Sequence, residues 1–256
     1  FVMHMLVFLQ NYPDHFSTNR FCPLCCCSHH PRSTSIYNNI SGHKINTTPK
    51  KFRKPRAFIK DAEDFYAAMR LLDERKKIGF GAIKKGRAKW KYQCAEFVNN
   101  FYDYRHHLME TDTKNWLKYI PPFDGIGSII NKIGKRHILF ISTTRDHKSV
   151  RFLLKKYGIK MKEENILSGS QGTDKIKHME HIANICKVRV NDIIFIDDIL
   201  DQVIKANRIG VRVILSSWGF SNMKQKNEAK KLGIPLANIK NLFSIVGSVA
   251  KAEYFD

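Results

Sequence analysis

The sequence lacks any apolar run long enough to cross a membrane. A spanning helix needs about 18 or more apolar residues, and the longest N-terminal candidate, from Phe1 to Leu9, is interrupted by His4. A hydrophobic content of 43% over 256 residues predicts a globular protein with one large domain and a smaller helical part. We therefore expect a soluble, cytoplasmic protein without a membrane span.

Acidic residues are also scarce, with 23 Asp and Glu against 44 Lys and Arg, which gives a formal net charge of +21. Such a charge favours encounters with nucleic acid, anionic membranes or phosphorylated ligands. Two local basic clusters stand out, KKFRKPR at residues 50–56 and KKGRAKWK at residues 84–91. The second cluster includes Trp90 and could follow a phosphate backbone, although a solvated helix face is the alternative interpretation.

The first fifty residues contain one acidic side chain, Asp14, and are rich in Asn, Ser, His, Pro and Cys. We interpret residues 1–55 as an atypical, poorly ordered segment. An organellar transit segment would share the lack of acids and the abundance of Ser, but Arg20 and Arg32 supply few of the arginines that it requires.

Four cysteines crowd into this segment, as Cys22, Cys25, Cys26 and Cys27, followed by a His-His pair at residues 29–30. A closed zinc site draws its second pair of ligands from farther along the chain, and no such pair is visible. A reduced, unstructured segment is therefore favoured over zinc. The remaining Cys94 and Cys186 are predicted to be isolated buried thiols, as in a reducing compartment.

After the atypical segment the apolar pattern changes twice. Residues 56–120 show helical spacing, with Phe65, Met69 and Leu72 on one face, and predict a helical subdomain. Residues 121–256 alternate short apolar strands with amphipathic helices. Such alternation predicts an α/β domain with a doubly wound parallel sheet covered on both faces.

The most informative stretch is IIFIDDILDQVIKANRIG, from Ile193 to Gly210. A continuous apolar run predicts a buried parallel strand, and it delivers Asp197 and Asp198 to the strand's carboxyl end. Ligands of open α/β sheets bind beyond this edge, so the Asp pair, assisted by Asp201, predicts a site for Mg²⁺ or for phosphate chemistry. A strand-end turn with a helix cap is the structural alternative.

Two further groups are expected at the same edge. In ILFISTT, an apolar strand from Ile138 ends in Ser142, Thr143 and Thr144, whose hydroxyl and backbone N–H groups could hold a phosphoryl oxygen. Lys175 begins a predicted helix in GTDKIKH, where an ammonium group could neutralise phosphoryl charge, with Lys177 as the alternative.

In this order, the segments PPFDGIGSIINKIGKRHILFISTT and FIDDILDQVIKANRIG resemble the second and fourth motifs of the haloacid dehalogenase-like (HAD) hydrolase superfamily. The resemblance implies a Rossmann-like core with a helical cap, and a phosphohydrolase that acts on a phosphorylated small molecule or phosphoprotein with Mg²⁺. It implies that Thr143 binds the transferred phosphoryl group and that Lys175 stabilises it. Asp197 would hold the metal, with Asp198 or Asp201 assisting.

Members of this family attack phosphorus with an aspartate from a first motif, Asp-x-Asp-x-Thr, at the end of the first strand. The sequence contains no such motif, and its nearest degenerate match is KINTT, where Lys44, Asn46 and Thr48 occupy the three positions. Lys cannot form an acylphosphate, and Asn cannot protonate a leaving group.

Three hypotheses follow. The chain is a phosphatase whose first motif has diverged or is absent from this sequence, or it is a catalytically inactive member that serves as a binding module. In the inactive member, the Lys44 ammonium would lie against Asp197 and replace the metal's charge. The third hypothesis is nucleic-acid binding by the basic surface.

Overall fold

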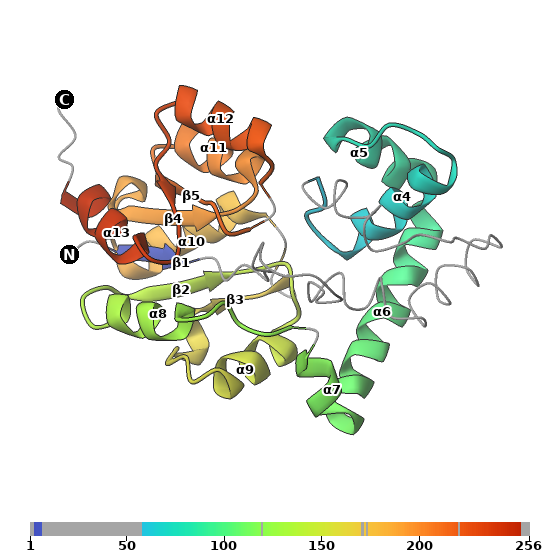
Figure 1. The fold of residues 1–256 in the computed structure, drawn as a ribbon, viewed down its shortest axis with the longest axis horizontal. Coiled ribbons are helices and arrows are strands. Elements are labelled where there is room, and N and C mark those ends of the chain that lie inside the picture. Colours follow the sequence, from blue (N-terminus) through green and yellow to red (C-terminus); the bar gives the residue numbers. More distant parts are fainter. Residues whose placement is uncertain are drawn as a thin grey trace. The chain divides into compact units, whose positions relative to one another are not determined.

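A parallel β-sheet is the centre of the first part of this computed structural model (Figure 1). The structure describes the backbone of residues 3–6, and residues 58–118, 120–169, 172, 174–219 and 221–251. Within these ranges the sheet has the strand order β3-β2-β1-β4-β5-β6, and every neighbouring pair is parallel. The strands are β1 (Met3–Leu6), β2 (Leu139–Ser142), β3 (Ile166–Leu167), β4 (Ile193–Asp197), β5 (Arg212–Ser216) and β6 (Leu236–Ala237).

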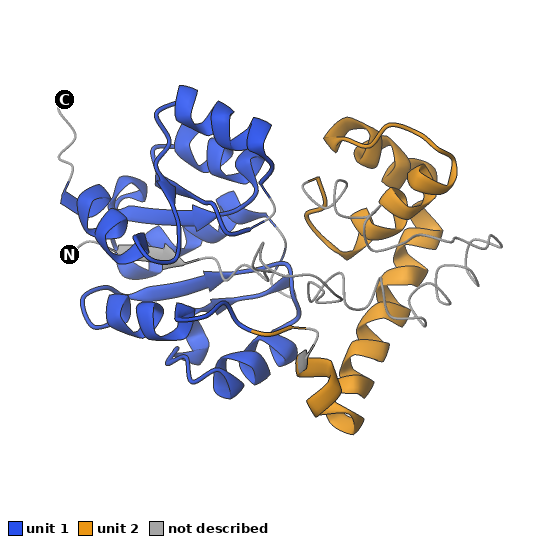
Figure 2. Ribbon diagram, in the orientation of Figure 1, with its two compact units in different colours: residues 1–14, 122–256 blue, residues 15–121 orange. Residues whose placement is uncertain are grey.

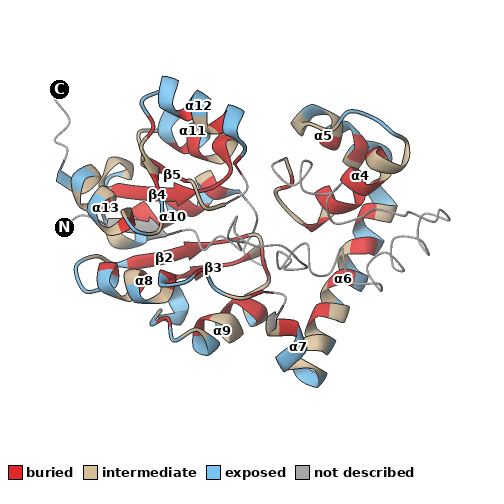
Figure 3. Cartoon of the chain, viewed as in Figure 1, coloured by how far each residue is buried: buried red, intermediate tan, exposed pale blue. Residues whose placement is uncertain are grey.

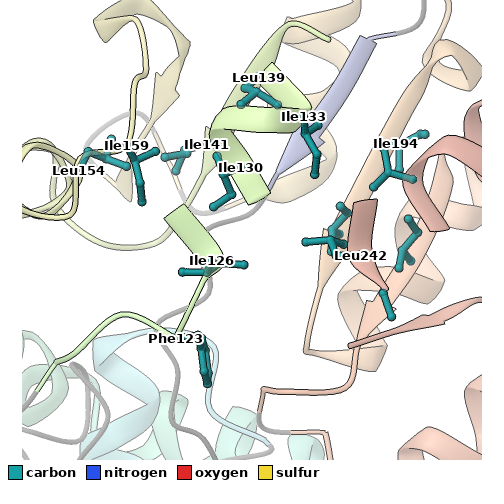
Figure 4. Packing of buried hydrophobic residues seen from close by; sticks show 14 of the residues in the cluster. Phe123, Ile126, Ile130, Ile133, Leu139, Ile141, Leu154, Ile159, Ile194 and Leu242 are labelled. Carbon is teal, nitrogen blue, oxygen red and sulfur yellow. The ribbon is translucent and has the colours of Figure 1, made fainter. Parts of the chain in front are cut away.

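Helices cover both faces of this sheet, as a doubly wound fold requires. They are α8 (Ile126–Gly134), α9 (His147–Lys156), α10 (Lys175–Cys186), α11 (Leu200–Arg208), α12 (Met223–Lys231) and α13 (Leu242–Lys251), with short 3-10 turns at Glu163–Asn165 and Val190–Asp192. Alternate residues of one strand enter different cores: Phe195 packs with α10 and α11, whereas Ile194 packs with α8 and α13 (Figure 4).

The predicted α/β class and parallel sheet are confirmed, and the predicted strands and helices after residue 121 are present with ends shifted by a few residues. Two of these helices, α9 and α11, are followed by a glycine in the left-handed region, Gly158 with φ 63° and Gly210 with φ 86°. This conformation is available to glycine without the steric cost that a Cβ imposes.

Strand β1 is a correction to the sequence interpretation, which predicted no strand within residues 1–55. Met3–Leu6 lies between β2 and β4, with Met3 opposite Ile193 and Leu6 opposite Ile196. A central strand needs only a short apolar run, because its neighbours supply all of its hydrogen-bond partners. The rest of that segment, including the Cys22 to Cys27 cluster and residues 50–56, lies outside the described residues.

The chain divides into two compact units, residues 1–14 with 122–256 and residues 15–121 (Figure 2). The second unit contains α4 (Ala62–Asp73), α5 (Phe80–Lys89), α6 (Lys91–Thr111) and α7 (Thr113–Lys118). Its core includes aromatic rings in contact, with Phe97 stacked on Phe101 at 5.8 Å between centroids. No helix among the described residues is both long and apolar enough to cross a membrane.

Burial along α6 follows one helical stripe, formed by Cys94, Phe97, Phe101, Arg105 and Met109 (Figure 3). Cys94 is buried as predicted, but Cys186 is half-buried, because it lies at the last position of α10.

Candidate active site

The carboxyl ends of β2 and β4 reach the same edge of the sheet, on either side of β1. Both strands run parallel to β1, so the residues that follow them, Thr143 and Asp198, leave the sheet in the same direction. Polar side chains are buried at this edge in spite of the apolar strands that carry them. Buried polar groups require partners, so the contacts of each one indicate its role.

Helix α10 brings Lys175 to this edge. Asp174 caps the helix by accepting a hydrogen bond from the Ile176 N–H at 2.9 Å, and Lys175 is the first helical residue. Its side chain is 5% exposed, and its Nζ donates a hydrogen bond to the backbone carbonyl of Ser142. The ammonium group therefore lies at the end of β2 and interacts electrostatically with Asp197 and Asp198 at the end of β4.

The two carboxylates are each 2% exposed. Burial raises the pKa of Asp197, and the neighbouring charge of Asp198 raises it further, while Lys175 and the Ile199 N–H oppose the rise. The Ile199 N–H donates to Asp197 Oδ1 at 2.8 Å. Burial lowers the pKa of Lys175 against the attraction of both carboxylates. Two buried carboxylates thus attract the same ammonium group, and both favour its charged form.

The hydroxyl groups of Ser142 and Thr143 have different surroundings. The Ser142 hydroxyl lies 2.6 Å from His178 Nδ1, so α10 holds both the carbonyl and the side chain of this residue. Burial lowers the pKa of His178 to about 4, and the nearby Lys175 charge lowers it too, which makes the imidazole neutral at pH 7. Thr143 Oγ1 accepts a hydrogen bond from the Arg145 N–H at 3.1 Å, and Thr143 is 7% exposed.

Asp201 is more exposed than the other two predicted metal ligands. It lies in the first turn of α11, where its carboxylate pairs with Lys205 at 3.0 Å and is 32% exposed. Within the described residues, no group of three or more His, Cys, Asp or Glu side chains is arranged to hold a metal ion. The structure therefore brings together Thr143, Lys175 and the Asp197–Asp198 pair, and places Asp201 in a surface ion pair.

Two glycines allow the loops at this edge to approach closely. A Cβ on Gly219 would lie 2.2 Å from both the Cβ and Oδ2 of Asp198. A Cβ on Gly169 would lie 2.5 Å from the backbone oxygen of Thr144. Only residues without a side chain fit at these two positions, so the loop after β5 lies directly against the Asp198 side chain.

A family model described as haloacid dehalogenase-like hydrolase matches residues 75–216, which is more than half of the chain. The chain belongs to the haloacid dehalogenase-like hydrolase family. The matched range contains Thr143, Lys175, Asp197 and Asp198, and it ends with β5.

Solved structures of this family share the fold. A predicted phosphoglycolate phosphatase from Haemophilus somnus 129pt has a TM-score of 0.61 at 11% identity, covering 96% of this chain and 98% of its own. β-Phosphoglucomutase from Clostridium difficile has a TM-score of 0.56 at 14% identity, covering 97% and 96%. A family IA, variant 3 HAD hydrolase from Entamoeba histolytica HM-1:IMSS has a TM-score of 0.60 at 16% identity, covering 98% and 100%. No curated protein matches the chain.

Strand β1 runs toward the same edge, because Leu6 lies opposite Ile196, the residue before Asp197. The KINTT segment, the nearest degenerate match to the first motif, lies outside the described residues. After Leu6 the sequence continues with Val7, Phe8 and Leu9, which lie outside the described residues. None of these residues has a carboxylate, and the first acidic residue of the chain is Asp14.

Sequence reasoning did not identify His178, Gly169 or Gly219 as parts of the site. The spacing of Lys175 and His178, three residues apart on a helix, indicates that they lie on one face. The pairing with Ser142 depends on how α10 docks on the sheet, which is tertiary information. The glycines carry no signal of this kind, since glycine is common in loops.

Proposed function

We propose that this chain is a phosphohydrolase that acts on phosphate monoesters with Mg²⁺ at the carboxyl edge of its sheet. The observation that carries this proposal is the buried Lys175 ammonium, which donates a hydrogen bond to the Ser142 carbonyl and is attracted by the carboxylates of Asp197 and Asp198. Burying three charged groups together costs folding free energy and is typical of sites that bind charged ligands.

The donor set fits Mg²⁺. This ion is usually held by one or two carboxylates, together with water and substrate phosphate oxygens. Asp197 and Asp198 supply two buried carboxylates at the carboxyl end of β4. When bound, Mg²⁺ would supply positive charge that offsets the negative charge of the phosphoryl oxygens.

The chain's own groups would then bind and orient the phosphoryl group. The Thr143 hydroxyl donates a hydrogen bond to a phosphoryl oxygen, and Lys175 offsets the charge that develops there. Ser142 fixes the position of α10 relative to β2. Its carbonyl accepts a hydrogen bond from Lys175 Nζ, and its hydroxyl contacts His178.

One observation favours a second function, phosphate-monoester binding without turnover. The residues that follow β1 in the sequence, Val7 to Leu9, offer no nucleophile in place of the family's aspartate. In both functions the site binds the same phosphoryl group. The two functions differ in whether a nucleophile then attacks its phosphorus atom. The charge-replacement hypothesis for Lys44 belongs to this second function, and Lys44 lies outside the described residues.

Hydrolysis of p-nitrophenyl phosphate, measured with and without Mg²⁺ for the wild type and the Asp197→Asn variant, tests the first function. We expect Mg²⁺-dependent turnover that the substitution reduces by at least about 100-fold. Absence of turnover in both proteins contradicts a phosphohydrolase. In that case calorimetric titration with Mg²⁺ and inorganic phosphate tests the second function, because a binding module still shows a signal that depends on Asp197.

The substrate class follows from the same chemistry. The site fits a dianionic phosphate monoester, on either a small molecule or a phosphoprotein. Two of the similar structures are described as phosphoglycolate phosphatase and β-phosphoglucomutase, whose names favour a phosphorylated small molecule for this chain too. A panel of small phosphate monoesters compared with a phosphopeptide separates these two classes.

A further inference from the structure

The helical unit has a surface on which positive charge is concentrated without neighbouring acids in the sequence. From Arg75 to Ala95 the chain has no Asp or Glu. It carries eight basic residues there: Arg75, Lys76, Lys77, Lys84, Lys85, Arg87, Lys89 and Lys91. Any acidic partner of these residues must therefore come from outside the stretch.

The α5 helix separates these cations from the core. Ile83 and Gly86 are buried, and a Cβ on Gly86 would lie 3.3 Å from Ala67 Cβ on α4. Lys84, Lys85 and Lys89 are exposed. At about 100° per residue these three lysines span one side of the helix, opposite Ile83 and Gly86. We call these three lysines, together with the exposed Lys91 and Tyr92 that follow them at the start of α6, the basic face.

The other cations of the stretch are partly occupied. Arg87 pairs with Asp61, Glu63 and Asp64 of the α4 region, and Lys76 pairs with Glu74. On the basic face, Lys84, Lys85 and Lys91 make no ion pair with any residue that the structure describes. Their charge is available to an external anion.

An exposed aromatic ring completes the basic face. Tyr92 is 84% exposed and follows Lys91 directly. The sequence had suggested Trp90 for this role, but Trp90 is 7% exposed and packs under the Arg70 guanidinium, whose centre lies 5.5 Å from its ring. Trp90 is thus buried, whereas Tyr92 is exposed to solvent.

We propose that the basic face binds single-stranded nucleic acid, with the lysines along the phosphate backbone and Tyr92 stacked on a base. Lysines along a surface with an exposed ring among them are the two components of sequence-independent single-strand binding. Anionic membranes fit less well, because interfacial helices insert an apolar face, and the apolar side of α5 is buried against α4. An acidic peptide would satisfy the lysines, but its recognition does not require an exposed ring beside them.

The test uses fluorescence anisotropy of a labelled oligouridylate of about ten nucleotides with the full-length chain. The Lys84→Gln/Lys85→Gln double variant removes two charges from the basic face. The matched control is Lys230→Gln/Lys231→Gln, since these are also adjacent, exposed lysines on a helix, α12. We expect at least about tenfold weaker binding for the basic-face variant, and a salt slope smaller by about 1.4. The control should change affinity less than about twofold.

Tyr92→Ala distinguishes nucleic acid from other polyanions. Stacking makes us expect about tenfold weaker binding of the oligonucleotide but unchanged competition by inorganic polyphosphate, which has no bases. Circular dichroism verifies that each variant is folded. Equal losses in the two lysine variants, absence of wild-type binding at low salt, or insensitivity to Tyr92→Ala each overturn the proposal. Equally tight binding of phosphatidylserine vesicles or polyglutamate would do so as well. The outcome is independent of phosphatase activity.

Discussion

The carboxyl edge of the sheet and the basic face of the helical unit both concentrate charge, but they do so in opposite ways. At the sheet edge, Lys175 and the two aspartates are almost completely buried and interact with one another. On the basic face, Lys84 and Lys85 are exposed and make no ion pair with any described residue. One region buries charges that interact electrostatically with one another, whereas the other leaves its charges exposed to solvent.

This difference determines which experiment can reveal each region. A buried charge loses its hydration on folding, so removing its partner changes the free energy of unfolding by several kcal/mol. An exposed lysine keeps its hydration, and its substitution changes stability by less than about 0.5 kcal/mol. The sheet edge should therefore respond in unfolding experiments, and the basic face should respond in binding experiments at varied salt.

The largest effect is expected for Lys175→Met. The substitution leaves Asp197 and Asp198 buried without their cation, which should lower the free energy of unfolding by about 3–5 kcal/mol at pH 7. Urea unfolding measures the loss. Lys177→Met is the matched control, because Lys177 is exposed on the same helix. Equal stability of the two variants would show that Lys175 does not compensate the carboxylates.

The next effect concerns pH and His178. Its pKa is lowered from 6.5 to about 4 by burial and by the Lys175 charge. Because the unfolded chain binds the proton more readily, the stability that neutral His178 contributes is present above about pH 6.5 and is lost as pH falls toward 4. His178→Gln should reduce the change in stability between pH 4 and 6.5 by up to about 3 kcal/mol.

Urea unfolding of wild type and variant at matched pH values measures this difference, and the opposite contribution of Asp197 cancels because both proteins retain it. His181→Gln, at an exposed position of the same helix, controls for the substitution itself. If the free energy of unfolding of His178→Gln depends on pH as strongly as that of the wild type, the His178 imidazole is not buried in its neutral form.

A smaller effect is expected for Gly219→Ala. The added Cβ would meet Asp198 at 2.2 Å, so the loop must move, at a cost of about 1–3 kcal/mol. Gly247→Ala on α13 is the control, since no atom lies within 4 Å of its added Cβ. Alanine is a better helix former, so this control should be stabilised by up to about 1 kcal/mol. Thermal unfolding compares them, and destabilisation of both would remove the special role of the Asp198 contact.

The sequence predicted some parts of the sheet unit better than others, for physical reasons. The β4 strand and Asp197 are marked by a local apolar run that ends in carboxylates. Strand β1 is four residues long and owes its place to pairing with β2 and β4, which no local pattern encodes. Likewise, the ion pair of Asp201 with Lys205 depends on a helical phase that begins at Leu200.

The aromatic residue of the basic face shows the same limit. Composition indicated an aromatic among cations, but only the turn between α5 and α6 decides that Trp90 faces the core and Tyr92 the solvent. Residue type was sufficient to find the charged regions. Burial, which follows from packing, decided what each charge can do.

The smallest predicted change in stability lies within α5, where a paired and an unpaired cation can be compared on one helix. Arg87 donates to Asp61 at 2.9 Å and to Asp64 at 3.1 Å, and the Asp64 carboxylate is 5% exposed. Arg87→Met leaves a buried carboxylate without its cation, but Arg87 is itself 35% exposed, so solvent screening limits the expected loss to about 1–2 kcal/mol. Lys85→Met should change the free energy of unfolding by less than about 0.5 kcal/mol.

Burial and the charge of Asp61 raise the pKa of Asp64, so the loss in Arg87→Met should shrink in acid as Asp64 takes up a proton. Thermal unfolding at pH 7 and pH 4 measures both changes, and a Lys85→Met loss as large as that of Arg87→Met would show that the basic face is part of the folded scaffold and not a free surface.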